Sequence, residues 1–285
     1  MIILFVELIK FLLYSLLIVL VSKYILVVLL RKLAEALNLK PKTVGNIAGV
    51  ATSVPELLTI SFSAFSGFMA TSVYNVLSSN VINLLQYLLS VLFNKNGTML
   101  KDRAIRIDVV LVVFTIILPI LMLLFQIPFD ITLVPIFLLL FFLFYFINHN
   151  VHKVYLAKQE RKIEQKIVEE TKWVKGKKKV IISYSISLII TAFLLFVVGN
   201  LLSNVLEQLC VTFGVPEVIL GILLGFITSI PELITFFESQ KHYRKQEGEK
   251  EKLGLIEATN NLLTSNMLNL FIIQTIGIII YSVIF

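Results

Sequence analysis

Two stretches of the sequence decide the fold, because one nearly repeats the other. Residues 49–59 read GVATSVPELLT, and residues 225–235 read GFITSIPELIT. Seven of these eleven positions are identical at an offset of 176 residues. A second motif follows each copy in the same order: residues 79–84 read SNVINL and residues 265–270 read SNMLNL. Two ordered matches of this kind indicate an internal duplication.

The sequence around these motifs is that of a membrane protein. Of 285 residues, 58% are hydrophobic and 15% are charged, whereas a soluble domain is about half apolar and a quarter charged. About 20 apolar residues are needed to cross the hydrocarbon core as a helix. Runs that meet this requirement predict eight spans, at residues 2–30, 44–65, 72–93, 107–126, 131–147, 180–206, 216–238 and 256–285.

The basic residues predict the orientation of these spans. Twenty-three of the 25 lysines and arginines lie in the gaps after spans one, three, five and seven, and the alternate gaps hold none. Basic loops are retained in the cytoplasm, so we expect both termini outside the cell membrane. The distribution also argues against nucleic-acid binding, despite the net charge of +7. The remaining two, Lys10 and Lys23, lie within span one; Glu7 precedes Lys10 by three residues and can pair with it.

The alternation of the spans makes the two copies inverted relative to each other. Span two runs from inside to outside, and span seven runs from outside to inside. We therefore expect an all-α inverted-repeat architecture, which is typical of transporters. The first repeat occupies residues 1–147 with five spans, and the second occupies residues 180–285 with three. The polar, basic segment 148–179 is predicted to be a partly helical cytoplasmic connector.

The first motif of each copy predicts a broken helix. Pro55 and Pro231 have no backbone N–H, so a helix kinks or breaks there and frees carbonyls near Thr52 and Thr228. Unpaired backbone is tolerated within a membrane only where it lines a cavity or a bound ion.

Acidic and amide side chains at these breaks predict a site for a hard cation. Glu56 and Glu232 lie inside apolar runs, where an ionisable residue costs roughly 2.5 kcal/mol or more and is usually functional. Calcium prefers six to eight oxygen ligands of this kind. The candidates are the two glutamates, the serines and threonines just before them, and two asparagines: Glu56, Glu232, Thr52, Ser53, Thr228, Ser229, Asn83 and Asn269. Soft ligands are missing, since Cys210 lies outside both motifs and no histidine lies in a predicted span, which disfavours zinc and copper.

Plainer interpretations exist for these polar residues. Serine and threonine often pack between membrane helices without binding an ion, and a single glutamate can serve folding alone. Two copies in inverted register favour the ion site. Asp108 and Asp130 lie near the ends of spans and are expected at the membrane interface. The spans contain no His–Ser pair or aspartate dyad, so we do not expect an enzyme.

At these residues the chain resembles the sodium/calcium exchanger (calcium/cation antiporter) superfamily. That family carries a paired motif Gly-Thr-Ser-x-Pro-Glu followed by Gly-Asn-x-x-Gly-Ser-Asn-x-x-Asn or Asp. Residues 52–56 (TSVPE) with 75–83 resemble the first copy, and residues 228–232 (TSIPE) with 261–269 resemble the second. The resemblance implies exchange of calcium for sodium or protons by alternating access, with no cofactor beyond the carried ions.

The resemblance also implies individual roles. Glu56 and Glu232 would be the main ion ligands, and Thr52 and Thr228 would contribute mainly backbone oxygens. The remaining ligands of the calcium and counter-ion sites would be Ser53, Ser229, Ser79, Ser265, Asn83 and Asn269. Spans one and six would slide against the core.

Three departures from the family pattern affect what the resemblance implies. Tyr74, Ser78, Asn260 and Thr264 replace glycines of the second motif. Both positions where some relatives carry aspartate are asparagine, which leaves two negative charges in the site. Five spans per repeat are usual, so the second repeat is expected to lack its last two. We therefore expect another copy or a partner subunit to cover its flank. The alternative function is that of a transport-dead relative acting as a structural or regulatory membrane subunit.

Overall fold

The computed structural model describes residues 2–29, 32–33, 41–155, 177–244 and 251–285. No strand occurs within these ranges. The centre of the predicted connector, residues 156–176, lies outside them, while its two ends are helical. The helices in chain order are α1 (Ile2–Val21), η1 (Ser22–Val27), α3 (Pro41–Thr52), α4 (Val54–Phe65), α5 (Met69–Phe93), η2 (Gly97–Lys101), α6 (Arg103–Leu124), α7 (Leu133–Tyr155), α9 (Lys177–Glu207), η3 (Gln208–Thr212), α10 (Glu217–Thr228), α11 (Ile230–Arg244), α12 (Glu251–Met267), η5 (Leu268–Ile273) and α13 (Gln274–Ile284).

Eight helical spans are long and apolar enough to cross a bilayer, which confirms the predicted number. They cover Ile3–Leu26, Gly45–Phe65, Met69–Phe93, Ile105–Leu124, Leu133–Asn150, Ile181–Thr212, Glu217–Lys241 and Gly254–Ile284 within the described residues. The sixth is longer than expected because the π-helical turn η3 continues α9 to Thr212.

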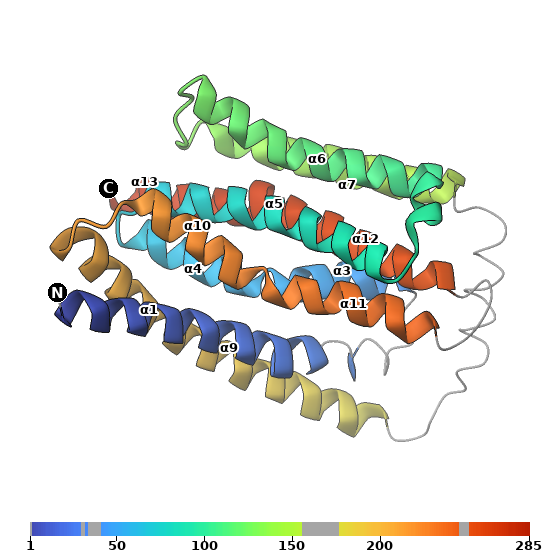
Figure 1. The fold of residues 1–285 in the computed structure, drawn as a ribbon, viewed down its shortest axis with the longest axis horizontal. Helices are drawn as coiled ribbons and strands as arrows, with labels where there is room; N and C mark the ends of the chain where they lie inside the picture. The colour runs from blue at the N-terminus through green and yellow to red at the C-terminus, as the bar shows by residue number, and fades with distance from the viewer. Residues whose placement is uncertain (1, 30–31, 34–40, 156–176, 245–250) are drawn as a thin grey trace.

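The helices form three layers (Figure 1). The helices that carry the motifs, α3–α4, α5, α10–α11 and α12–α13, lie between α6 and α7 on one side and α1 and α9 on the other. The broken helices run in opposite directions: α3 to α4 from right to left in Figure 1, and α10 to α11 from left to right. This is the relation that the inverted order of the motifs predicts.

The connections that carry basic residues gather at one end of the bundle. The end of α5, the starts of α6, α9 and α12 and the ends of α7 and α11 all lie at the right of Figure 1. Arg103, Lys177 and Arg244 stand at these helix ends. We call this side the basic end.

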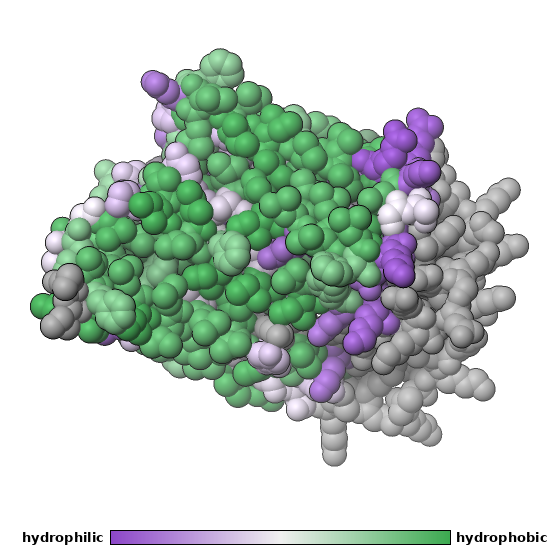
Figure 2. All heavy atoms as spheres, in the orientation of Figure 1, coloured by the Kyte–Doolittle hydropathy of each residue, from purple (hydrophilic) through white to green (hydrophobic). Residues whose placement is uncertain are grey.

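The outer surface of the bundle is apolar. Figure 2 shows hydrophobic residues over most of the visible face, with hydrophilic residues concentrated near the basic end. Large side chains such as Phe193, Ile189 and Leu124 are about 70% exposed. Hydrophobic surface on this scale is stable only in contact with lipid, so the chain is a multi-pass membrane protein.

Three acidic residues outside the motifs have hydrogen-bond or ion-pair partners. Lys10 Nζ lies 2.7 Å from Glu7 Oε1, which confirms the predicted pair within span one. Asp130 is half-buried between α6 and α7, and hydrogen bonds from the Thr132 side chain and backbone hold its pKa below the usual value; its place at the membrane interface stays a prediction. Asp108 lies near the start of α6 but is fully buried, because α7 packs over it and Asn148 donates a hydrogen bond to it at 3.0 Å; its place at the membrane interface stays a prediction.

Candidate cation-binding site

The site forms where the two broken helices meet α5 and α12. Helix α3 stops at Thr52 and α4 starts at Val54, with Ser53 between them at φ −83° and ψ 0°. Ser229 separates α10 from α11 in the same way, with φ −78° and ψ −1°. Proline stands in the first turn of each second half, where its missing N–H costs least. This places Glu56 and Glu232 in the first turns of α4 and α11.

Both glutamates are completely buried, and their carboxylates lie close enough to interact electrostatically. Thr228 and Ser79 lie beside the Glu56 carboxylate. Thr52 and Ser265 lie beside that of Glu232. Each glutamate therefore contacts the threonine of the opposite repeat, and the two halves form one site.

The main feature of this site is a group of buried oxygen atoms that have no hydrogen-bond partner. Six buried oxygens around it have no hydrogen-bond partner: both carboxylate oxygens of Glu56, Oε2 of Glu232, Oδ1 of Asn83, Oδ1 of Asn269 and Oγ1 of Thr228. A buried acceptor without a donor costs about 1–3 kcal/mol, and more if it is charged. Polar residues that merely hold helices together would bond to one another. Five of these oxygens can only accept, and the sixth, Thr228 Oγ1, is a hydroxyl oxygen; such a set of oxygens fits a hard cation.

Reciprocal hydrogen bonds turn the amide oxygens of the asparagines toward the site. Asn83 Nδ2 donates to Asn266 Oδ1 at 3.1 Å, and Asn269 Nδ2 donates to Asn80 Oδ1 at 3.3 Å. Asn80 and Asn266 also donate to each other's backbone carbonyl, at 3.2 and 3.1 Å. Because the amide nitrogens are used in this network, the Oδ1 atoms of Asn83 and Asn269 remain available as ligands.

A second reciprocal pair fixes the backbone next to each glutamate. Thr59 Oγ1 donates to the Glu56 carbonyl at 3.1 Å and accepts from Asn75 Nδ2 at 2.7 Å. Thr235 likewise donates to the Glu232 carbonyl and accepts from Asn261 Nδ2. These bonds tie α4 to α5 and α11 to α12, so the first turn that carries each glutamate is held in place.

The two halves differ at the serines. Ser265 Oγ donates to Glu232 Oε1 at 3.0 Å and lies 3.0 Å from Ser53 Oγ. Ser79 Oγ instead donates to Asn75 Oδ1 at 3.3 Å, and the Glu56 carboxylate oxygens have no hydrogen-bond partner. Ser229 Oγ donates to the Gly225 carbonyl at 2.7 Å. All ten predicted residues are thus brought together, and their roles as ligands stay a prediction.

Close helix packing around the site depends on four glycines that our sequence analysis did not single out as packing residues. Gly45 and Gly49 of α3 lie against α12, and Gly221 and Gly225 of α10 lie against α5. A Cβ on Gly49 would meet the Asn261 carbonyl at 2.9 Å, and one on Gly225 would meet the Asn75 carbonyl at 2.7 Å. The Gly-x-x-x-Gly spacing in an apolar run was the signal that could have identified them.

The same glycines accommodate the residues that depart from the family motif. Tyr74 packs on Gly221 and Ser78 on Gly225. Asn260 packs on Gly45 and Thr264 on Gly49 in the same manner. Small residues on the partner helix therefore compensate for bulk at the second motif, and the helices still approach closely.

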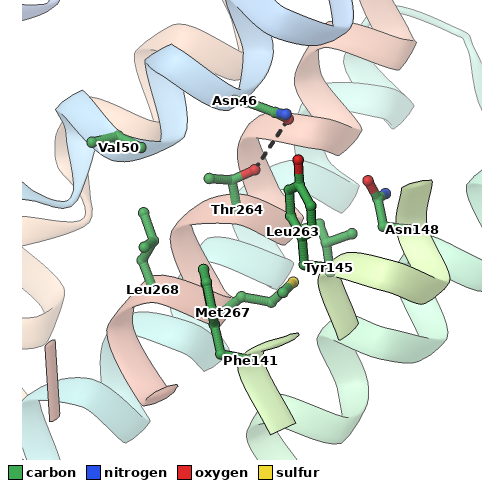
Figure 3. A pocket seen from close by; sticks show the side chains of 9 residues that line it. All are labelled: Asn46, Val50, Phe141, Tyr145, Asn148, Leu263, Thr264, Met267 and Leu268. Carbon is green, nitrogen blue, oxygen red and sulfur yellow. Dashed lines mark hydrogen bonds between the residues drawn. The ribbon is translucent and has the colours of Figure 1, made fainter. Parts of the chain in front are cut away.

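A pocket on the side of the bundle lies apart from this site. Figure 3 shows it between α3, α7 and α12, where Thr264 donates a hydrogen bond to Asn46 at 3.2 Å. Its other lining residues are Val50, Phe141, Tyr145, Asn148, Leu263, Met267 and Leu268. No carboxylate lines the pocket, so it is not the cation site.

Comparisons with known proteins agree with the fold. A family model described as sodium/calcium exchanger protein matches residues 8–150 and 183–284, which include both pairs of motifs. A structure of the sodium-calcium exchanger NCX_Mj, soaked with Na+ and without Ca2+, is similar with a TM-score of 0.53. The identity is 18%, and the match covers 98% of this chain and 84% of that chain. No protein of curated function matches the chain.

Proposed function

Since the chain belongs to the sodium/calcium exchanger protein family, we propose that it exchanges calcium, or a similar hard cation, for sodium or protons. The observation that carries this proposal is the set of six buried oxygens around Glu56 and Glu232 that have no hydrogen-bond partner. Two carboxylates supply the charge that a divalent ion needs, and amide and hydroxyl oxygens supply the remaining ligands.

Alternating access follows from the burial of the site. Glu56, Glu232, Asn83 and Asn269 are fully buried, so an ion can enter or leave only after helices move. We assign this movement to α1 and α9, which pack on each other and form an outer layer against α4 and α10. The contact between α9 and α4 includes Gly199 beside Phe62 and a Ser66–Ser203 hydrogen bond of 2.6 Å.

The sidedness of the protein forms part of the same proposal. We place the basic end in the cytoplasm and both termini outside. Labelling of single cysteines at either end of the bundle in sealed cells tests this placement. Labelling of basic-end cysteines from outside would contradict it.

Calcium uptake into proteoliposomes tests the proposed exchange. Purified protein is reconstituted, an outward gradient of sodium or of protons is imposed, and uptake of radioactive calcium is followed. We expect uptake with one of the two gradients and its loss in Glu56→Gln and Glu232→Gln. Glu207→Gln makes the same chemical change at an exposed position of α9 and should retain uptake.

The alternative of a transport-dead subunit makes the opposite prediction. Folded wild-type protein would show no uptake with either gradient and no stabilisation by calcium. The four packing glycines favour the exchanger, because they preserve the helix contacts that the replaced glycines would otherwise have provided.

We expected the cover on the flank of the second repeat, but an exposed face lies on α5 of the first repeat. We further propose that a second copy or a partner subunit covers this face. Leu85, Leu89 and Leu92 are 54%, 48% and 68% exposed on this face. Their counterparts in the second repeat, Phe271, Thr275 and Ile278, are at most 3% exposed, and Phe271 packs on Phe137 and Phe144 of α7. The first repeat has no equivalent cover among the described residues.

A further inference from the structure

The charge of the cation site is set by two carboxylates. Among the described residues, the acidic groups that line it are Glu56 and Glu232. Every other oxygen identified there belongs to a neutral amide or hydroxyl group. No lysine, arginine or histidine is among the side chains that the structure describes as buried. The empty protein site therefore carries a charge of −2 when both glutamates are ionised.

Three further buried acids belong to other surroundings. Glu7 pairs with Lys10 on α1 at 2.7 Å, Asp108 of α6 accepts a hydrogen bond from Asn148 of α7, and Glu257 accepts one from Ser239 at 2.7 Å. Glu257 precedes Ser265 by eight residues on α12, which is about 12 Å along the helix axis. We assign none of these acids to the position where the two glutamates meet.

The asparagines cannot supply a third charge. Asn83 and Asn269 occupy the positions where an aspartate would add a carboxylate, and their amide nitrogens are used as donors to Asn266 and Asn80. Their oxygens can bind a cation but cannot neutralise one. Asn83 and Asn269 can therefore add ligand oxygens to the site without adding negative charge.

Net charge is what limits an ion in a closed, buried site. An uncompensated charge in a low-dielectric interior is costly, and in a membrane it is more so. One divalent cation, or two monovalent cations, neutralises the two carboxylates, whereas a third monovalent cation leaves a net charge of +1. We infer that the exchange is electroneutral, with one divalent cation moving one way for two monovalent cations moving the other. This inference rests on the proposed function.

The equilibrium calcium distribution under a fixed voltage tests this inference. Wild-type protein is reconstituted with a fixed gradient of the counter-ion, and potassium with valinomycin clamps the membrane at 0 or −100 mV. The internal-to-external calcium ratio at zero net flux is then measured. Moving one net charge per cycle would shift that ratio by about fifty-fold between the two voltages. We expect a shift of less than about twofold.

The outcomes separate this inference from the proposed function. Exchange whose equilibrium follows the voltage would overturn the electroneutral stoichiometry and leave the exchange function standing. Complete absence of exchange in folded protein would overturn both.

Discussion

Replacing Gly225 with alanine tests whether close helix packing positions the cation ligands. An added Cβ would lie 2.0 Å from Ser78 Oγ, 2.7 Å from the Asn75 carbonyl oxygen and 2.8 Å from the Ser79 nitrogen. The Ser78 hydroxyl can rotate away, but the other two are backbone atoms of α5 and cannot. Ordinary contact begins at 3.4 Å, and α10 must therefore move away from α5 by about 0.7 Å.

That displacement reaches the site directly. The Gly225 carbonyl accepts hydrogen bonds from the Ser229 nitrogen at 3.3 Å and from Ser229 Oγ at 2.7 Å, and Glu232 follows three residues later. Ligands must be held within about 0.5 Å of their working positions. Overpacking of this kind costs about 1–3 kcal/mol. If the substitution raises the free energy of the calcium-bound state by this amount relative to the empty state, calcium affinity falls by about 5- to 150-fold.

Thermal unfolding in detergent, followed by size-exclusion chromatography with and without calcium, measures the effect. Bound calcium raises the midpoint temperature of unfolding. The calcium concentration at which this rise begins reports the dissociation constant of calcium. Gly97→Ala is the matched control, because a Cβ at Gly97 meets no atom within 4 Å. The reasoning is refuted if Gly225→Ala binds calcium within twofold of wild type and unfolds at the same temperature.

Four further results are expected. Asn75→Ala and Asn261→Ala should each lower the free energy of unfolding by about 1–3 kcal/mol, measured by denaturation, since each leaves a buried threonine without its donor. Tyr87→Phe should cost about 1 kcal/mol in the same assay and leave calcium affinity unchanged, because its hydroxyl pairs with Thr259 and not with the site. Calcium binding should weaken as the pH falls, because protons compete for Glu56 and Glu232; isothermal titration should show up to two protons released per calcium ion, and at most one in Glu232→Gln. Leu89→Cys in a Cys210→Ala background should form a cross-linked dimer on oxidation in membranes if a second copy covers α5, whereas the lipid-facing control Phe193→Cys should not.

Local properties of the sequence determined the spans and the glutamates. Whether a run of about 20 residues can cross a bilayer depends on its own composition, so eight spans were predicted correctly. Proline weakens the helix that contains it, and the breaks at Ser53 and Ser229 stand two residues before Pro55 and Pro231. Proline alone does not decide the break, because α6 continues through Pro119. The duplication then placed Glu56 and Glu232 at equivalent depths.

Contacts between distant segments required the tertiary structure. The burial of Asp108 depends on α7 packing over α6, so its distance from the end of a span did not predict its surroundings. Gly49 and Gly225 work through backbone atoms of helices more than 140 residues away in sequence. The tertiary structure also determines which oxygens lack a hydrogen-bond partner. Asn83 and Asn269 direct their oxygens to the site because Asn266 and Asn80 accept hydrogen bonds from their amide nitrogens. A sequence specifies which groups can donate or accept, but the distance between two such groups is known only once the helices are packed.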